Sequence, residues 1–287
     1  SMLSLTIGDI SVQRIIEFEG PFFEPGRFFP DATSEALAPH LNWLVPKALD
    51  AETGMLIFPF QSYLVRTAHH AILIDTCVGC GKEIPHRPQW HMRTDRLWLE
   101  KLAATGLRRE NVDYIFCTHL HVDHCGWNTD FVDGKWVPTF PNATYIFAAE
   151  EYAAAETENS MIFQQSVLPV MEAGKAKLVK SDFALDDQIW LEPTPGHTAG
   201  HVAVHLSSNG ERAVMCGDLI HSPLQCARPD WCAFVDLDKD LARQTRRNFM
   251  AGNAESGRLV LTAHFPSPSM GHFVAEGDAF RFDYLED

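Results

Sequence analysis

The sequence has no long apolar run and no basic run, and each absence excludes a class of protein. No window approaches the roughly eighteen consecutive apolar residues of a membrane-spanning helix, so we expect no membrane partner. The formal net charge is −15, and an acidic surface repels phosphate backbones, so we expect no nucleic-acid partner. The start, SMLSLTIGDISV, lacks a basic segment followed by an apolar stretch and does not match a signal peptide.

The sequence also lacks the cysteine pattern of a disulfide framework. The seven cysteines are odd in number and scattered through strand-like segments, which predicts reduced thiols in a cytoplasmic protein. Cys77 and Cys80 form a single CxxC pair. Without a second pair it is a weak zinc or redox signal, and ordinary small residues in a loop explain it more readily.

The composition that remains is that of a globular protein. Of 287 residues, 46% are hydrophobic and 21% are charged. Apolar and polar residues alternate over 3–18, which predicts one or two strands. Residues of about 20–54 are rich in proline, glycine and aromatics, and we interpret them as an insertion without regular structure. Its phenylalanines could line a substrate pocket, cover the surface of a homodimer or pack beneath a long loop.

Further elements follow from hydrophobic periodicity. Residues 57–76 read as a hairpin, and His69 and His70 at its turn are expected to be solvated. Asp75 ends the second strand, as a cap or as a partner of a nearby ligand loop. We predict helices at about 94–106 and 239–250, a strand running into a helix over 143–156, and a helix interrupted by Pro169 over 161–174.

The most informative stretch is 113–128, DYIFCTHLHVDHCGWN. A short apolar run, Tyr114 to Cys117, reads as a buried strand. Ligand-type side chains follow it at once, namely His119, His121, Asp123 and His124. Side chains two apart in extended chain share a face, so His119 and His121 can reach one metal ion together. Asp123 and His124 are placed to hold a second ion.

Three later strands end in the same kind of residue. The segment QIWLEPTPGH places His197 in a turn, ERAVMCGD ends at Asp218, and RLVLTAH ends at His264. With the first motif, these give seven ligands, which suit two metals if Asp218 bridges them. One ion would take His119, His121, His197 and Asp218, and the other Asp123, His124, Asp218 and His264. His201 and His205 are then more readily supporting or core residues than ligands.

In their order and spacing, HLHVDH, PGHTAGH, GD and AH resemble the motifs of the metallo-β-lactamase superfamily of dinuclear metallohydrolases. The resemblance covers nearly the whole chain and implies one domain over residues 1–287 with an α+β fold, an αββα sandwich. The C-terminal AHFPSPSMGHFVAEGDAFRF is similar to the branch that contains methyl parathion hydrolase and certain N-acyl-homoserine lactonases. Several lactonases place a tyrosine three residues after the bridging aspartate, where this chain has His221.

The resemblance implies two divalent ions, most readily zinc, with manganese, iron or cobalt as alternatives. Their bridging hydroxide would attack a neutral small-molecule lactone or ester. Asp123, Asp218 and His221 are the candidate catalytic residues, with His221 either a proton donor to the leaving group or a packing residue. The candidate pocket residues are Phe22, Phe28, Phe29, Trp127, Phe265 and Met270.

Other functions remain open from the sequence. A phosphotriesterase or a β-lactam hydrolase could use the same ligands. An iron-dependent oxygenase of the same fold typically lacks part of the second-metal set, whereas Asp123, His124 and His264 are all present here. A scaffold without catalysis is disfavoured because buried carboxylates and imidazoles are costly to retain without metal.

Overall fold

The structure is a computed structural model that describes residues 2–286. The chain forms two compact units. Unit A comprises Leu3–Glu17 and Phe60–Phe183, and unit B comprises Met2 with residues 18–59 and 184–286. Within the described residues, every helix is too short or too polar to cross a membrane. The expectation of a single domain over residues 1–287 stays a prediction.

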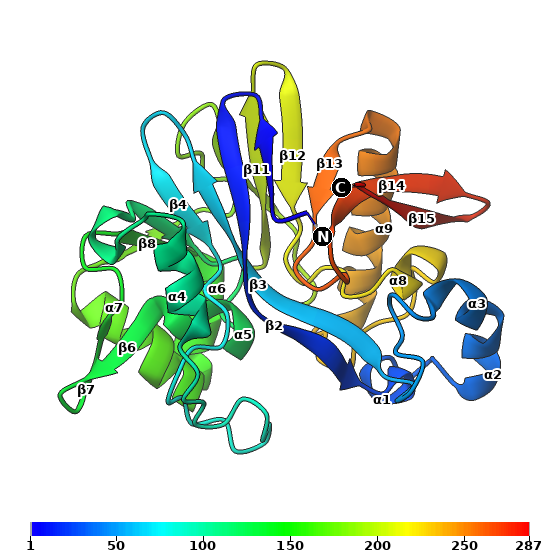
Figure 1. The fold of residues 1–287 in the computed structure, drawn as a ribbon, viewed down its shortest axis with the longest axis horizontal. Helices are drawn as coiled ribbons and strands as arrows, with labels where there is room; N and C mark the ends of the chain where they lie inside the picture. Colours follow the sequence, from blue (N-terminus) through cyan, green and yellow to red (C-terminus); the bar gives the residue numbers. More distant parts are fainter. Residues whose placement is uncertain (1, 287) are drawn as a thin grey trace. The chain divides into compact units, whose positions relative to one another are not determined.

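Unit A is built on a mixed seven-stranded sheet (Figure 1). Its strands, in spatial order, are β1 (Ser4–Ile7), β2 (Ile10–Phe23), β3 (Leu56–Arg66), β4 (Ala71–Ile74), β5 (Tyr114–Phe116), β8 (Thr144–Ala148) and β9 (Ala176–Val179). β4 and β5 are parallel, with Ile74 opposite Phe116. Because parallel strands end at the same edge, the residues after β4 and after β5 meet there. The β3–β4 pair confirms the predicted hairpin.

Helices and a small hairpin complete unit A. They are α4 (Leu97–Ala104), η2 (Arg109–Asn111), α5 (Val122–Cys125), η3 (Gly126–Asn128), α6 (Ala149–Glu158), η4 (Phe163–Val167), α7 (Leu168–Glu172) and the strands β6 (Thr129–Val132) and β7 (Lys135–Pro138). The core contains Trp98 and Trp127, whose rings stack with centroids 6.0 Å apart. This core lies directly behind the segment that follows β5, so the ligand loop of unit A has a packed support.

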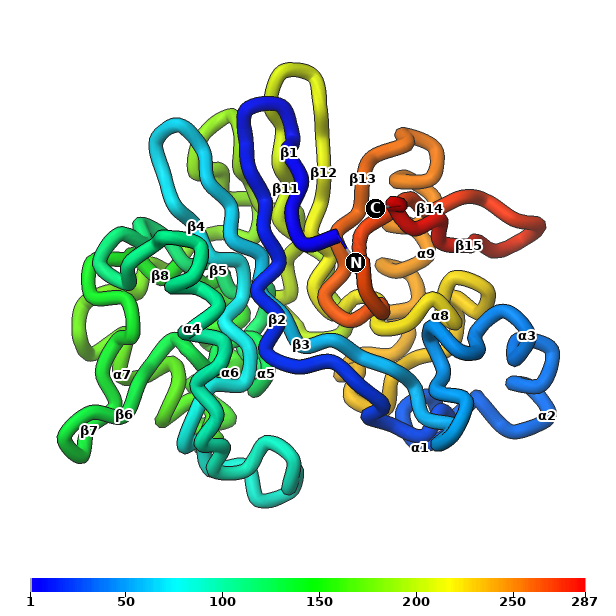
Figure 2. Tube along the Cα trace, viewed as in Figure 1, coloured from blue at the N-terminus to red at the C-terminus, as the bar shows by residue number. Residues whose placement is uncertain are grey.

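Unit B contains a six-stranded sheet in chain order: β10 (Ile189–Pro193), β11 (Val202–Ser208), β12 (Glu211–Met215), β13 (Leu259–Leu261), β14 (Met270–Glu276) and β15 (Ala279–Tyr284). β12 and β13 are parallel and therefore end at one edge, while β14 and β15 form the hairpin drawn in red in Figure 2. Helix α9 (Lys239–Ser256) packs on β14, and α8 (Leu224–Ala227) precedes it. The side chain of Asp238 accepts a hydrogen bond from the backbone of Leu241 at the start of α9.

The aromatic segment of unit B has more regular structure than we expected. Strand β2 extends to Phe23, and short helices follow: α1 (Pro25–Phe28), α2 (Ser34–Leu37), η1 (Ala38–His40) and α3 (Leu41–Leu44). Pro25 occupies the first turn of α1, where a missing N–H costs nothing, and Thr33 caps α2. The expectation of an irregular segment over 20–54 was therefore wrong where local capping residues start these helices.

Candidate metal-binding site

In unit A, the edge formed by β4 and β5 holds a buried carboxylate, that of Asp75. Thr118 donates to it twice, from its backbone N at 2.7 Å and from Oγ1 at 2.9 Å. His124 Nδ1 lies 2.8 Å from Asp75 Oδ2. Because a carboxylate only accepts, His124 carries its proton on Nδ1 and directs Nε2 as its donor atom toward a metal. Asp75 is thus a partner of the ligand loop, one of its two predicted roles.

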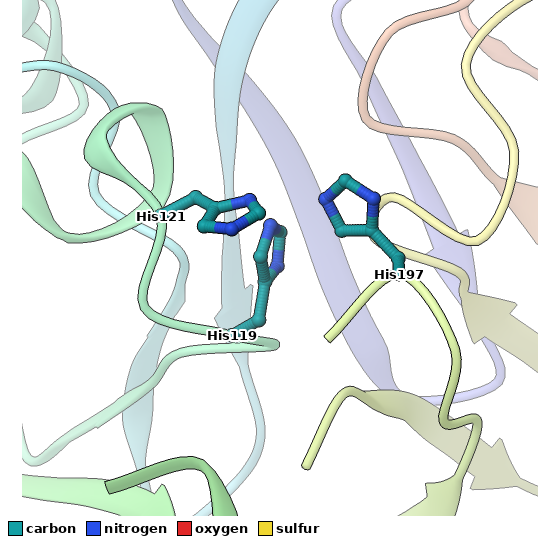
Figure 3. A group of neighbouring side chains, drawn as sticks. All are labelled: His119, His121 and His197. Carbon is teal, nitrogen blue, oxygen red and sulfur yellow. The ribbon is translucent and has the colours of Figure 1, made fainter. Parts of the chain in front are cut away.

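His119 is oriented by the same chain of hydrogen bonds. Its Nδ1 lies 3.0 Å from Thr118 Oγ1, which already donates to Asp75 and so accepts from this imidazole. The His119 ring lies 4.1 Å from that of His124 and 4.8 Å from that of His121, centroid to centroid. Figure 3 shows His119 and His121 on the loop after β5, and His197 on the loop after β10. The rings of His119, His121 and His124 thus lie close together in unit A.

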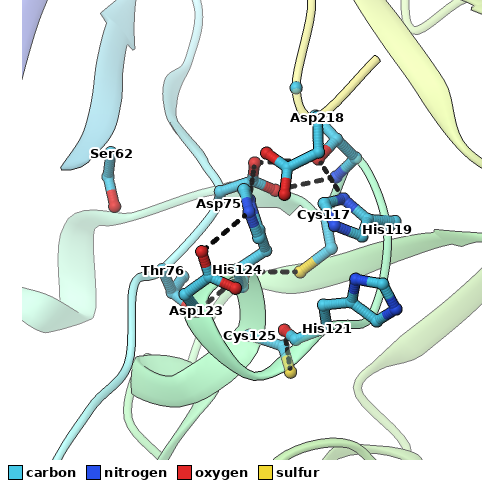
Figure 4. Close-up of polar contacts among 12 residues, drawn as sticks. Ser62, Asp75, Thr76, Cys117, His119, His121, Asp123, His124, Cys125 and Asp218 are labelled. Atoms are coloured by element: carbon cyan, nitrogen blue, oxygen red, sulfur yellow. Dashed lines mark hydrogen bonds and ion pairs between the residues drawn. The ribbon is translucent and has the colours of Figure 1, made fainter. Parts of the chain in front are cut away.

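Helix α5 places Asp123 beside His124 (Figure 4). Asp123 Oδ2 and His124 Nε2 are 3.3 Å apart. Two ligands on one zinc ion, each at about 2.0–2.2 Å in tetrahedral geometry, are separated by about 3.3–3.5 Å, so the spacing fits a shared ion. The helix is anchored at Gly126, where an added Cβ would lie 1.9 Å from the carbonyl oxygen of Val78. Only glycine allows this approach.

In unit B, Asp218 follows β12 and presents its two oxygens to different imidazoles. Oδ2 lies 3.5 Å from His197 Nε2 and 3.3 Å from His221 Nε2, whereas Oδ1 lies 3.0 Å from His264 Nε2. The ligand atoms of His197, Asp218 and His221 could together hold one ion. This division of oxygens is the arrangement expected of a carboxylate that bridges two metals.

His197 is held by a second buried carboxylate. Its Nδ1 lies 2.7 Å from Asp236 Oδ1, and its carbonyl accepts from the backbone of Leu237 at 3.1 Å. Burial lowers the pKa of His197, but hydrogen bonds and charge from Asp218 and Asp236 outweigh it and raise the pKa to about 9. A divalent cation would replace that proton on Nε2, so the surroundings of His197 favour positive charge.

Four further histidines of unit B, His201, His205, His221 and His264, make different contacts. His264 Nδ1 donates to the carbonyl of Pro59 at 2.9 Å, which directs its Nε2 to Asp218. His201 Nε2 accepts from the backbone N of Asp218 at 2.9 Å, so His201 supports that residue, as predicted. His205 is paired with Glu192 Oε1 at 2.6 Å on the sheet. Burial lowers the pKa of His221 below its usual value.

The six candidate pocket residues divide by location. Phe28 lies beside the site residues of unit B, with its ring 5.0 Å from that of His221, and Phe22 is half-buried near Phe23. Phe29 is fully buried against Phe28. The other three are likewise fully buried, Trp127 in unit A and Phe265 and Met270 in unit B.

Two buried carboxylates escaped the sequence reasoning. Asp236 stands 39 positions from the histidine it contacts. Glu17 accepts hydrogen bonds from the backbone of Val78 and Gly79 and from Trp127 Nε1 at 2.9, 3.2 and 3.1 Å, and burial raises its pKa to about 7. No motif marks either residue. The one available signal for a buried carboxylate was an acidic residue within a strand of mainly apolar residues, such as Glu17 in β2.

Comparison with known proteins identifies the family of the chain. A family model described as Metallo-beta-lactamase superfamily matches residues 59–276. An N-acyl homoserine lactonase from Bacillus cereus is 26% identical over 175 residues, covering 56% of this chain and 64% of the lactonase. The chain thus matches less than two thirds of the length of these curated relatives.

Two solved structures have a similar fold. Hydrolase AbOPH of the beta lactamase superfamily aligns with a TM-score of 0.82 at 25% identity, covering 99% of this chain and 97% of AbOPH. AidC, a dizinc quorum-quenching lactonase, aligns with a TM-score of 0.82 at 22% identity over the same shares of the two chains. These likenesses confirm the predicted metallo-β-lactamase fold of the α+β class, and the lactonase relatives match the predicted branch.

Proposed function

Because the chain belongs to the metallo-beta-lactamase superfamily, we propose that it is a metal-dependent hydrolase that cleaves the ester bond of a neutral lactone or carboxylic ester. The observation that carries the proposal is the division of the Asp218 carboxylate, with Oδ2 toward His197 and Oδ1 toward His264. The lactonase relatives support the ester class of substrate. The negative surface of the chain favours a neutral substrate over an anionic one.

We assign the ligands as the motifs imply. One ion would be held by His119, His121, His197 and Asp218, and the second by Asp123, His124, Asp218 and His264. Imidazole nitrogens and carboxylate oxygens suit zinc, and the spacing between Asp123 and His124 fits zinc bond lengths. When bound, two divalent ions supply a hydroxide nucleophile near neutral pH and a Lewis acid for the carbonyl oxygen.

The protein supplies proton transfer and orientation. Asp123, whose side chain is 10% exposed on α5, could accept the proton released by the attacking water. His221 is buried with its Nε2 3.3 Å from Asp218 Oδ2, so Nε2 carries the proton, and this is the proton that His221 could donate to the leaving alkoxide. The edge of Phe28 against His221 supplies an apolar wall for the substituent of the substrate.

A hydrolysis screen of the metal-analysed protein tests the proposed reaction. We expect turnover of lactones or aryl esters that is lost on chelation and regained with zinc. Asp218→Ala should abolish it, whereas His69→Ala, at an exposed hairpin turn, should not. Turnover that survives full removal of metal would contradict the proposal. A preference for phosphotriesters or β-lactams would support the metal site but would show that the proposed ester class of substrate is wrong.

Elemental analysis tests the number of ions separately. Seven ligands exceed what one tetrahedral site uses, so we expect two ions per chain after reconstitution. At most one tightly bound ion per chain in excess zinc would contradict the dinuclear assignment while leaving a hydrolase with one metal.

A further inference from the structure

Arg246 is a fully buried arginine in the middle of α9, and it has no role in the reaction proposed above. It is 1% exposed. Its three nitrogens all donate: Nε to Pro229 O at 2.8 Å, one terminal nitrogen to Leu219 O at 3.2 Å and the other to Cys232 Sγ at 3.3 Å. A buried charge costs several kcal/mol, on the order of the stability of a domain, unless it is paired and hydrogen-bonded.

The partner of this charge is the carboxylate that holds His197. Arg246 lies 3.8 Å from Asp236 Oδ2, and both side chains are 1% exposed. Asp236 Oδ2 also accepts from the backbone N of Ala233 at 3.0 Å, and Oδ1 contacts His197 Nδ1 at 2.7 Å. A continuous chain of contacts therefore runs from α9 to a proposed metal ligand, entirely within unit B.

Arg246 binds three residues of the segment that leads from Asp218 to Asp236. Leu219 directly follows Asp218, and Pro229 and Cys232 flank the turn before Asp236. The backbone of this turn closes on the ligand loop, with Leu237 N and Asp238 N donating to His197 O and Gly196 O at 3.1 and 3.0 Å. Movement of Arg246 would therefore displace Asp236 relative to His197.

We propose that Arg246 is a positioning residue that orients the Asp236 carboxylate against His197 and so sets the metal affinity of unit B. The inference rests on the proposed metal site. A simpler role, in which Arg246 only attaches α9 to the 219–232 segment, predicts a loss of stability with no specific effect through Asp236. The two roles differ in how mutations at 246 and 236 combine.

The test is a double-mutant cycle read by zinc affinity, measured on metal-free protein by competition with a chelator. Asp236→Ala should weaken zinc binding about 10- to 100-fold, the usual effect of removing a partner of a ligating histidine. Arg246→Met should weaken it about 10-fold, and the double variant should resemble Asp236→Ala alone. Arg247→Gln is the matched control, because Arg247 lies on the same helix and binds Asp230 in the same loop at 2.9 Å. It should bind zinc like the wild type.

Urea unfolding of each metal-free variant accompanies the titrations. If Arg246→Met does not fold, Arg246→Gln takes its place, because the amide keeps donors and removes the charge. The inference would be overturned if the losses of zinc affinity caused by the substitutions at Arg246 and Asp236 were additive. It would also be overturned if a folded Arg246→Met or Arg246→Gln variant bound zinc as tightly as the wild type. A wild-type chain that binds no zinc would instead overturn the proposed metal site.

Discussion

Lys82 offers a test of the physical chemistry of unit A that needs no substrate. Its side chain is 1% exposed, and Nζ donates to Thr129 Oγ1 at 2.5 Å and lies 4.0 Å from the ring centre of Trp136. Thr129 Oγ1 in turn donates a hydrogen bond to the carbonyl oxygen of Gln165 at 2.6 Å. Burial lowers the pKa of Lys82 from 10.5 to about 7 despite the nearby Asp130.

The sign of the effect follows from proton binding. Between pH 7 and 10.5 the unfolded chain binds more protons at this position than the folded chain, so the free energy of unfolding rises with pH in that window. The two pKa values differ by 10.5 − 7 = 3.5, which corresponds to a cost of about 4 kcal/mol at pH 7. Lys82→Met removes this cost but loses a hydrogen bond and a cation–π contact, each about 1 kcal/mol.

We therefore expect Lys82→Met to be about 2 kcal/mol more stable than the wild type at pH 7 and no more stable at pH 9.5. Urea unfolding followed by tryptophan fluorescence at several pH values between these limits measures the difference. Lys135→Met, on the exposed β7 strand, controls for the loss of one positive charge. A destabilised Lys82→Met at pH 7, or a difference that does not change with pH, would refute the reasoning.

Three further predictions concern the site. His221→Ala should slow substrates with poor alkoxide leaving groups by about 100-fold and activated aryl esters hardly at all, which a leaving-group series measures; equal losses would show a packing role. Asp75→Ala should weaken zinc binding about 10- to 100-fold, because His124 and Thr118 lose their acceptor, and chelator competition that finds wild-type affinity would refute this. Phe28→Ala should raise KM for substrates with large apolar groups more than for small ones, and an equal change for both would remove it from the pocket.

The sequence marks the candidate ligand residues more clearly than the residues that surround them. The motif after β5 concentrates four ligands in six positions, and each later ligand stands at the end of a strand with clear alternation. Such signals are local, so one sequence suffices to read them. The same reasoning missed β6, β7, β9 and the β14–β15 hairpin, and it ended α9 six residues early, at 250 instead of 256. Short strands such as β9 are chosen by partners that local periodicity does not reveal.

The contacts that orient the ligands are long-range. Asp75 and His124 are 49 positions apart, and Glu17 and Trp127 are 110 apart. Arg246 donates a hydrogen bond to the carbonyl of Pro229, which is 17 positions away in a segment whose sequence is typical of a loop. Which acidic residue reaches which imidazole depends on strand order and register, so a single sequence cannot assign these pairs.

The hydrogen bonds at Nδ1 distinguish four proposed ligands from the proposed proton donor. In four of the proposed ligands, this nitrogen is held by a protein acceptor, as in His119 by Thr118, His124 by Asp75, His197 by Asp236 and His264 by Pro59. Such bonds fix the tautomer and leave Nε2 for the metal. His221 has no such acceptor among the described residues, although its Nε2 is as close to Asp218 as that of His197. His221 therefore differs from these four in the nitrogen that is held, because its Nε2 lies 3.3 Å from the carboxylate of Asp218 and carries the proton of the neutral ring. We propose that this proton, and not a metal, is what His221 supplies to the reaction.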